Sequence, residues 1–516
     1  MPRHRRHRHK KPGSPHHEPE QSCEPPTQSE AKYYIVKQSE SLGRYLEASR
    51  DIAEGTVIIE AEPLVVGPVS DSAPLCLGCY TELSSIDSAE NCKSCKWPLC
   101  SNACKGLNKI NGHSKEECLL LSKCPIESNS LQKQQLYNAI FPLRCLMLRE
   151  HQPEKWRILN TMQAHNELRR KQQSIWNYNQ KSVVDRIRNE WKIDKFTEEE
   201  IHTVCGYAEV NAFSIGGDSI NIQGLYPEAY FFAHDCVANT SHTDDENYKI
   251  KVFTSVKLRQ GQMLTLSYTN SLKGTVKRRE HLRKCKFFEC SCQRCSDSTE
   301  LGTYMSALKC RNCSAGRVLP VEPLRDDTDW RCDACNSTHL NKDINTAINR
   351  VEQEISGLDQ EKVLLIEAAI RRYSGLLHPS HYLIVGLKYS LSQLYGKTAG
   401  FLISQMNEET LERKVQICED ILKIFDIVEP GFTRIRAITM YELHAPLMIL
   451  TIKQSERGHI SHTDLARNLK RVAFYLRECV RLLKFEPKGT QEDSIRTAAQ
   501  EGLVQLKSWE PAVGKL

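Results

Sequence analysis

Residues 233–240 read AHDCVANT, residues 261–270 read GQMLTLSYTN, and residues 288–295 read FECSCQRC. The third segment spaces its cysteines as C-x-C-x2-C, and Cys236 stands alone in the first. Zinc binds four thiolates in a tetrahedron, and two or three of them usually come from one tight turn. A zinc ion would therefore pin the first segment against the chain that follows Tyr268, and the sequence predicts a pocket between them. The predicted ligands are Cys236, Cys290, Cys292 and Cys295.

These segments resemble the motifs of SET-domain lysine methyltransferases: an Asn-His-x-Cys segment, a downstream Asn, a turn into Ser-Tyr-Thr and a C-x-C-x2-C tail. From about residue 33 to the end, the chain resembles the SET and MYND (SMYD) branch, in the form widespread in arthropods. The resemblance implies an α+β fold. Its β-rich SET domain, in two halves (31–70 and 205–285), would be split by a MYND zinc finger (76–118) and a helical insert (120–204). A post-SET zinc segment (286–296), a zinc ribbon (305–340) and a tetratricopeptide-like helical region (344–516) would come after it.

The resemblance also implies S-adenosylmethionine-dependent methylation of lysines on histone or non-histone proteins, with a role in transcription or chromatin regulation. A neutral lysine amine attacks the sulfonium methyl group in line, so the enzyme must chiefly align and dehydrate the reactants. By resemblance Tyr268 is the catalytic residue and also contacts the cofactor. His234 would present backbone groups to the cofactor, and Phe288 would lie against the adenine. Asn239 would close the pseudo-knot of the fold.

Two residues depart from the family pattern. Ala233 stands where the family has Asn, and a lost amide hydrogen bond to the cofactor is worth about 1 to 3 kcal/mol. Lys286 stands by spacing where the family has an aromatic residue at the lysine channel. A cation there would repel both the sulfonium and an incoming ammonium unless it points outward, although Asp235 would partly offset the charge. The alternative function is a catalytically weakened SET and MYND scaffold that recruits protein partners.

The composition fits one catalytic unit with appended modules, because 516 residues at 40% hydrophobic can fill several cores. The N-terminus lacks the apolar segment of a signal peptide, and no apolar run approaches the roughly 20 residues needed to cross a bilayer. Of the 22 cysteines, 15 fall into metal-ligand spacings, which is typical of zinc proteins in a reducing compartment. We expect a protein of the nucleus and/or cytoplasm with no membrane partner.

Residues 1–30 are rich in His, Arg, Lys and Pro, a composition that predicts disorder. The first 12 residues contain six Lys and Arg and no acid, and the whole chain carries a net charge of +6, so the rest has no net charge. Nucleic acid could therefore bind only through this tail, as an import or binding arm. A merely solvated tail is the alternative.

Residues 33–68 alternate apolar and polar side chains with glycine breaks, which predicts short strands. By resemblance the turn at Leu42, Gly43 and Arg44 lets the backbone approach the cofactor closely. Residues 120–210 space apolar side chains at three and four residues, which predicts helices. By resemblance an arm of this insert near His165 contributes to the cofactor pocket; alternatively His165 is a surface or capping residue.

Residues 76–118 contain seven cysteines and one histidine in an order that resembles a MYND finger. By resemblance one zinc would take Cys76, Cys79, Cys100 and Cys104. The other zinc would take Cys92, Cys95, His113 and Cys118. Every coordination position would be filled by protein, so both ions would be structural. MYND fingers generally bind proline-containing peptides; the alternative is a finger that only packs on its own SET domain.

A further set of cysteines has the C-x2-C, eighteen residues, C-x2-C spacing of a zinc ribbon. Its predicted ligands, which bring the expected number of zinc ions to four, are Cys310, Cys313, Cys332 and Cys335. From residue 344 the chain shows amphipathic helical patterns separated by Pro and Gly, without a strict 34-residue repeat. Such a helical stack normally narrows or covers the substrate cleft in the family.

Overall fold

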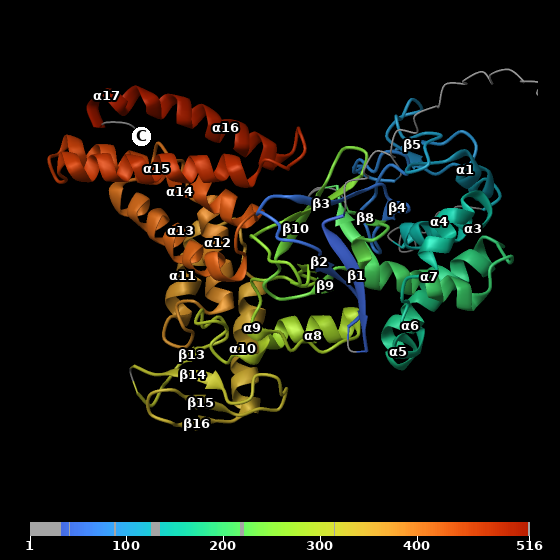
Figure 1. Ribbon diagram of the computed structural model, residues 1–516, viewed down its shortest axis with the longest axis horizontal. Helices are drawn as coiled ribbons and strands as arrows, with labels where there is room; N and C mark the ends of the chain where they lie inside the picture. Colours follow the sequence, from blue (N-terminus) through green and yellow to red (C-terminus); the bar gives the residue numbers. More distant parts are fainter. Residues whose placement is uncertain are drawn as a thin grey trace, which may run out of the picture.

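The computed structural model describes residues 32–40, 42–86, 89–124, 135–216, 221–313 and 315–513. The predicted basic tail, residues 1–30, lies outside this range. Figure 1 shows the strands in the middle of the molecule, the finger and the insert helices on one side, and the C-terminal helices on the other. The mixed helices and strands and the helical C-terminal region agree with the predicted α+β class.

The central strands come from two parts of the chain that are far apart in sequence. β1 (Tyr34–Ser39) pairs with β2 (Gly43–Ala48), which comes directly after it. β3 (Val57–Ala61) instead pairs with the distant β11 (Ile250–Thr254), which also pairs with β10 (Thr240–Asp244). β4 (Val65–Pro68) pairs with β8 (Ile222–Leu225), which also pairs with β7 (Phe213–Ile215). The strands before the finger therefore fold together with those after the insert.

The finger and the insert share one core with these strands. The finger contains the two-residue strands β5 (Glu90–Asn91) and β6 (Pro98–Leu99) and ends in α1 (Lys115–Leu121). The insert consists of η1 (Leu136–Ala139), α3 (Ile140–His151), α4 (Pro153–Leu159), α5 (Asn166–Lys171), α6 (Gln173–Asn179), η2 (Gln180–Val184), η3 (Arg186–Glu190) and α7 (Glu198–Asn211). The segments η2 and η3 are π-helical, a departure from the α-helix that the spacing of residues 183–193 predicts.

A capping box starts α7, in which the Thr197 side chain accepts from the Glu200 amide and the Glu200 side chain accepts from the Thr197 amide. The helix then continues to Asn211, past the insert boundary predicted at residue 204. Residues 208–211 therefore form the last turn of this helix, which agrees with the helices predicted over residues 120–210. This places the last carbonyl groups of α7 beside the end of α8.

The chain after the strands forms a connector, a ribbon and a helical stack. The connector comprises α8 (Thr275–Lys286) and α9 (Gln293–Ser296). The ribbon strands are β13 (Leu308–Lys309), β14 (Arg317–Pro320), β15 (Trp330–Cys332) and β16 (Thr338–His339), paired in that order. The stack runs through α10 (Asn341–Ser356), α11 (Val363–Tyr373), α12 (Tyr382–Leu394), α13 (Glu408–Val428), α14 (Arg434–Glu456), α15 (His462–Leu482), α16 (Gln491–Leu506), η5 (Lys507–Trp509) and α17 (Glu510–Val513).

The helical stack packs on the strand domain through a cluster of aromatic rings with backbone hydrogen bonds beside it. The rings of Phe253, on β11, and Phe485, after α15, lie with centroids 4.3 Å apart. The Phe432 amide donates to the Ser255 carbonyl over 2.9 Å. Such an aromatic contact contributes to the packing of the stack on the strand domain. Among the described helices, none combines the length and the apolar character that spanning a membrane requires.

Candidate active site and metal centres

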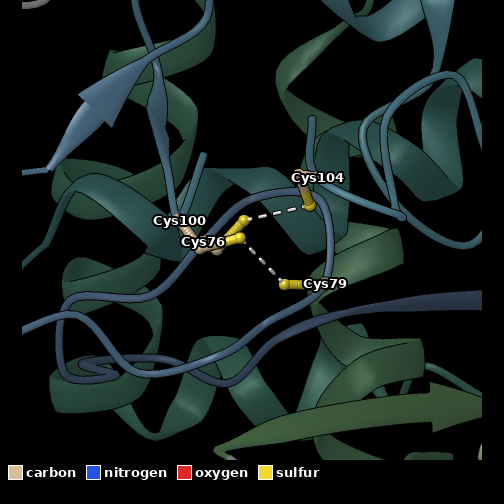
Figure 2. A group of neighbouring side chains, drawn as sticks. All are labelled: Cys76, Cys79, Cys100 and Cys104. Carbon is tan, nitrogen blue, oxygen red and sulfur yellow. Dashed lines mark hydrogen bonds between the residues drawn. The ribbon is translucent and has the colours of Figure 1, made fainter. Parts of the chain in front are cut away.

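The first finger site brings together four thiols from two loops. Cys76 and Cys104 have their sulfurs 3.5 Å apart, and those of Cys79 and Cys100 lie 3.6 Å apart. Figure 2 shows the four side chains, which come from two stretches of the finger, close to one another. Two thiolates on one tetrahedral zinc lie roughly 3.8 Å apart, so the spacing fits that ion.

The second finger site is supported by a carboxylate behind its histidine. Cys92 and Cys118 have their sulfurs 3.5 Å apart, and Cys95 Sγ lies 3.2 Å from His113 Nε2. The other ring nitrogen, His113 Nδ1, lies 2.7 Å from the Glu117 carboxylate. A carboxylate there fixes the ring orientation and leaves Nε2 available for a metal.

Arg144 connects this carboxylate to the strand domain. Its guanidinium donates to Glu117 and, over 2.9 Å, to the Val66 carbonyl on β4. Burial alone would raise the pKa of Glu117, but the charge of Arg144 and the His113 hydrogen bond hold it below its ordinary value. The buried pair therefore anchors the finger to the body of the protein.

The third site assembles the post-SET segment on the AHDC segment. Cys236 Sγ lies 3.5 Å from Cys295 Sγ and 3.9 Å from Cys290 Sγ, and Cys292 completes the group. These cysteines surround Leu282 in a small cluster against Tyr268 and Phe288. The pinning that the sequence predicts is therefore present.

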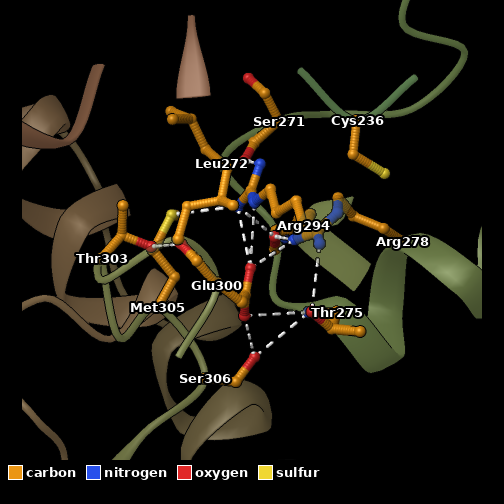
Figure 3. A network of polar contacts seen from close by, with 12 residues as sticks. Cys236, Ser271, Leu272, Thr275, Arg278, Arg294, Glu300, Thr303, Met305 and Ser306 are labelled. Atoms are coloured by element: carbon orange, nitrogen blue, oxygen red, sulfur yellow. Dashed lines mark hydrogen bonds and ion pairs between the residues drawn. The ribbon is translucent and has the colours of Figure 1, made fainter. Parts of the chain in front are cut away.

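Two buried arginines lie beside this third site. Arg278 donates to Cys295 Sγ over 3.5 Å and to the Glu300 carboxylate over 2.7 Å, and Arg294 donates to the same carboxylate over 3.1 Å. Figure 3 shows the two guanidinium groups and Glu300 meeting between α8 and the chain that leads to the ribbon. A zinc ion with four thiolates carries two net negative charges, and the excess positive charge of this network would compensate part of it.

The ribbon site is formed by the ends of its strands. Cys310 and Cys335 have sulfurs 3.7 Å apart, as do Cys313 and Cys332. A Cβ atom on Gly316 would lie 2.1 Å from Cys332 Sγ, so only glycine lets the backbone pass this close to the sulfurs. In all, the described residues contain four such groups, and each has the members expected from the sequence.

Tyr268 lies where β9 (Ala233–His234) pairs in parallel with β12 (Thr265–Leu266). Asn239 joins the two segments, since its side chain donates to the Met263 carbonyl and accepts from the Thr265 amide, each over 2.8 Å. These two hydrogen bonds match the pseudo-knot contact that the resemblance implies for Asn239. It fixes the backbone on both sides of Tyr268.

The Tyr268 hydroxyl is protonated and directed by its surroundings. It donates to the Phe232 carbonyl, and burial raises the pKa of Tyr268 well above its ordinary value. The Tyr268 amide donates to His234 Nδ1 over 3.0 Å, so this nitrogen is the acceptor of the imidazole. Burial lowers the pKa of His234 to about 4, which keeps the ring neutral. The site therefore holds a neutral hydroxyl and a neutral imidazole.

Two of the predicted cofactor residues, His234 and Phe288, lie beside this tyrosine. The His234 ring centroid lies 5.7 Å from that of Phe288, and the His165 ring lies 5.8 Å from Phe287. Gly43 adopts a positive φ of 67°, as its turn requires, and a Cβ there would lie 3.9 Å from the Gln163 amide nitrogen. The turn at Gly43 thus lies against the insert arm, and the insert arm lies against the aromatic rings that follow α8.

The flanking turn residues take different positions. Arg44 stacks on the Phe231 ring, 4.7 Å from its centroid, and donates to the Thr161 carbonyl. Leu42 is half exposed. His165 caps α5 with a left-handed φ of 52° and directs its ring toward Phe287.

Sequence reasoning missed two residues of this region, Gln163 and Phe287. The Gln163 carbonyl accepts from the Asn211 side chain over 3.1 Å, which ties the insert arm to the end of α7. Phe287 ends α8 in a left-handed conformation with φ of 62°. Phe287 could have been predicted from its position next to Phe288, whereas no motif in the sequence around Gln163 predicts a role for it.

The two departures have different structural consequences. Ala233 keeps its place in β9 opposite Thr265 and offers backbone groups only. Lys286 does not point outward: its ammonium lies 5.8 Å from the Tyr268 ring centroid and donates to the Glu209 and Val210 carbonyls. Asp235, expected to offset its charge, instead accepts from the Val237 amide over 2.8 Å.

Comparison with known proteins gives relatives along most of the chain, although no protein-family model matches it. The SET domain-containing protein SmydA-8 (isoform B) of Drosophila melanogaster is 28% identical over 372 residues, covering 69% of this chain and 79% of the relative. A SET and MYND domain-containing protein of Dictyostelium discoideum is 24% identical over 375 residues, 59% of this chain and 96% of the relative. The histone-lysine N-methyltransferase Smyd1 of Mus musculus is 24% identical over 324 residues, 58% of this chain and 64% of the relative. With its motifs in family order and its four ligand groups assembled, the chain belongs to the SET and MYND domain (SMYD) family.

Proposed function

We propose that the protein is an S-adenosylmethionine-dependent protein-lysine N-methyltransferase. The observation that carries the proposal is the protonated Tyr268 hydroxyl at the crossing of β9 and β12, with His234 and Phe288, two of the residues expected to bind the cofactor, beside its ring. The name of the mouse relative, a histone-lysine N-methyltransferase, supports the same activity.

The residues present fit this cofactor in part. The Gly43 turn leaves its backbone open, and the rings of His165, Phe287 and Phe288 offer apolar faces suited to an adenine. Ala233 offers no side-chain amide, so we expect weaker binding than in relatives that have Asn. When bound, the cofactor would supply a methyl group on a positively charged sulfur.

The protein's own groups would orient and dehydrate the acceptor. Tyr268 is half-buried and packs on His234 and Phe288, so an amine that enters beside it loses part of its water. The neutral state of His234 avoids adding a positive charge near the reacting sulfonium. The carbonyl oxygens of Phe232, Glu209 and Val210 already accept from Tyr268 and Lys286, and each has a second lone pair that could face an amine or a polarised methyl group.

We propose three further features of the function. The substrate would be a lysine of a histone or non-histone protein, in transcription or chromatin regulation, in the nucleus and/or cytoplasm. The finger would bind proline-containing peptides, and a shallow hollow beside it, lined by apolar residues such as Leu64, Ile110 and Met147 as well as by charged ones, offers a surface for them. Contact with nucleic acid would depend on residues 1–30, outside the described range.

The alternative is a scaffold with a weakened site, and the position of Lys286 over Tyr268 favours it. Two measurements distinguish the methyltransferase from the scaffold. The first is calorimetric titration with S-adenosylmethionine, and the second is an assay of methyl transfer to a cell-extract protein pool. We expect binding, and transfer that disappears in Tyr268→Phe but persists in Tyr441→Phe, a control in α14. A wild-type protein that binds no cofactor would leave the scaffold as the function.

A further inference from the structure

Lys286 is the last residue of α8, and its side chain turns back into the site. Its Nζ donates to the carbonyl oxygens of Glu209 and Val210, each over 2.9 Å, and lies 5.8 Å from the centroid of the Tyr268 ring. An amine from this chain therefore already lies where the proposed function requires an amine, beside the orienting tyrosine.

The end of α7 explains why the amine is held there. The last carbonyl groups of a helix have no partner within the helix, and Glu209 and Val210 belong to the last turn of α7. The Glu209 carboxylate is occupied separately, because Arg169 donates to it over 2.7 Å. The carbonyls, rather than the carboxylate, therefore fix the position of Lys286.

We propose that Lys286 is itself a methyl acceptor, so that the protein methylates its own side chain within one molecule. This inference rests on the proposed function, since it takes the methyl group from S-adenosylmethionine. Here the lysine that accepts the methyl group belongs to this chain, whereas the proposed function concerns lysines of other proteins.

The hydrogen-bond arrangement suits a neutral amine as nucleophile. A neutral lysine amine has two N–H groups and one lone pair; the two carbonyls use both N–H groups and leave the lone pair free. Burial lowers the pKa of Lys286 to about 8, against the opposing effects of Cys285 and the Glu209 carboxylate. The amine can therefore release its third proton to solvent near neutral pH.

In the transfer, the Lys286 nitrogen forms a bond to the methyl carbon as the carbon–sulfur bond breaks. The electrons of the broken bond stay on sulfur, and S-adenosylhomocysteine, a neutral thioether, is the leaving group. The product is a methylammonium with two N–H groups, which still satisfy both carbonyls. A second methyl group would leave one carbonyl without its donor, so we expect a single methyl group.

The test is the mass of the peptide that contains Lys286, both in the protein as purified from cells and after incubation with S-adenosylmethionine. We expect one added methyl group, lost in Lys286→Arg and retained in Lys284→Arg, an exposed lysine on the same helix that pairs with Glu280. The rate constant of incorporation should not change when the protein is diluted, because donor site and acceptor share one molecule. A rate that rises with protein concentration would overturn the intramolecular assignment.

Calorimetric titration of the same preparation distinguishes two kinds of failure. If S-adenosylmethionine binds and other proteins are methylated while Lys286 stays unmodified, this inference is wrong and the proposed function stands. If no binding heat is measured, the proposed function fails and this inference fails with it. The wild-type peptide mass decides the question even if Lys286→Arg does not fold.

Discussion

Arg278 donates from its guanidinium to the sulfur of Cys295 over 3.5 Å, and both side chains are buried. The same guanidinium pairs with Glu300 over 2.7 Å, so one side chain connects the third zinc site to the segment that leads to the ribbon. Burial alone would raise the pKa of Glu300, but the charges of Arg278 and Arg294 hold it below its ordinary value. The carboxylate is therefore ionised, and the integrity of the zinc site should depend on this ion pair.

Arg278→Met should destabilise the protein and weaken the third zinc site. Removing one partner of a buried ion pair costs about 3 to 5 kcal/mol, and Arg294 remains on Glu300, so we expect about 3 kcal/mol. Urea unfolding and the zinc content after mild chelation measure the two effects. Arg325→Met, an exposed residue of the ribbon, is the control. An unchanged unfolding midpoint with full zinc retention in Arg278→Met would show that the pair does not support the site.

The protein should contain about four zinc ions per chain, because 15 cysteines and His113 form four groups of ligand atoms, each within 4.8 Å of one another. Elemental analysis of protein purified without chelator measures the content. Because every group is filled by protein ligands, a strong chelator should remove zinc only together with folded structure, which circular dichroism would show. A content of two ions or fewer would refute the third site or the ribbon site.

Cys292→Ser should unfold the post-SET segment and abolish cofactor binding, since a structural zinc site contributes directly to folding. The melting temperature and the calorimetric affinity for S-adenosylmethionine measure both effects. Cys285→Ser is the matched control, because this cysteine is exposed on α8 and belongs to none of the four groups. If both variants behave like wild type, Cys292 is not a zinc ligand.

The sequence was most informative where ligand spacing fixes geometry. Each of the four metal groups contains a C-x2-C or C-x-C-x2-C spacing, because such short loops can direct two sulfurs to one ion, and the resemblance supplied the pairing within the finger. The crossing at Asn239 was expected from the resemblance, since it needs a particular side chain at that place.

Contacts between segments that are far apart in the chain were harder to predict from the sequence. Neither Arg278 nor Glu300 carries a motif, and an ion pair between them becomes visible only when α8 is placed against the chain that comes after it. The direction of Lys286 depends on the last carbonyl groups of α7, and nothing in the sequence places these groups beside the end of α8. Side-chain spacing also does not separate π-helix from α-helix in residues 180–190.

Acid should destabilise the protein partly through His202. Its ring stacks on Trp176 at 3.6 Å, and burial, followed by the charge of Arg169, lowers its pKa from 6.5 to about 4. Between these values the unfolded chain binds a proton that the folded chain does not, so stability is present above pH 6.5 and falls as the pH drops toward 4. The loss attributable to this residue is about 3 kcal/mol at most.

The melting temperature measured from pH 7 to pH 5 checks this dependence. His202→Phe keeps a ring against Trp176 and cannot take up a proton, so its melting temperature should fall less steeply than that of wild type. His459→Phe, in an exposed turn after α14, should show the same pH dependence as wild type. Equal slopes for wild type and His202→Phe would exclude His202 as a source of acid lability.

Ala233→Asn tests whether the site is complete apart from one amide. If it is, the new side chain should form one hydrogen bond to the cofactor and tighten S-adenosylmethionine binding by about 1 to 2 kcal/mol, roughly 5- to 30-fold. Ala466→Asn, in α15, should leave the affinity unchanged.

Whether tighter binding leads to turnover depends on Lys286, because its ammonium lies beside Tyr268. If that ammonium excludes a substrate amine, Ala233→Asn will bind more tightly without methylating other proteins, and the double variant with Lys286→Tyr will be needed for turnover. Affinity and methyl transfer to a protein pool should therefore be measured for wild type, both single variants and the double variant. A wild type that binds no cofactor, together with an Ala233→Asn variant that gains no affinity, would show that the lost amide is not what separates this site from an active one.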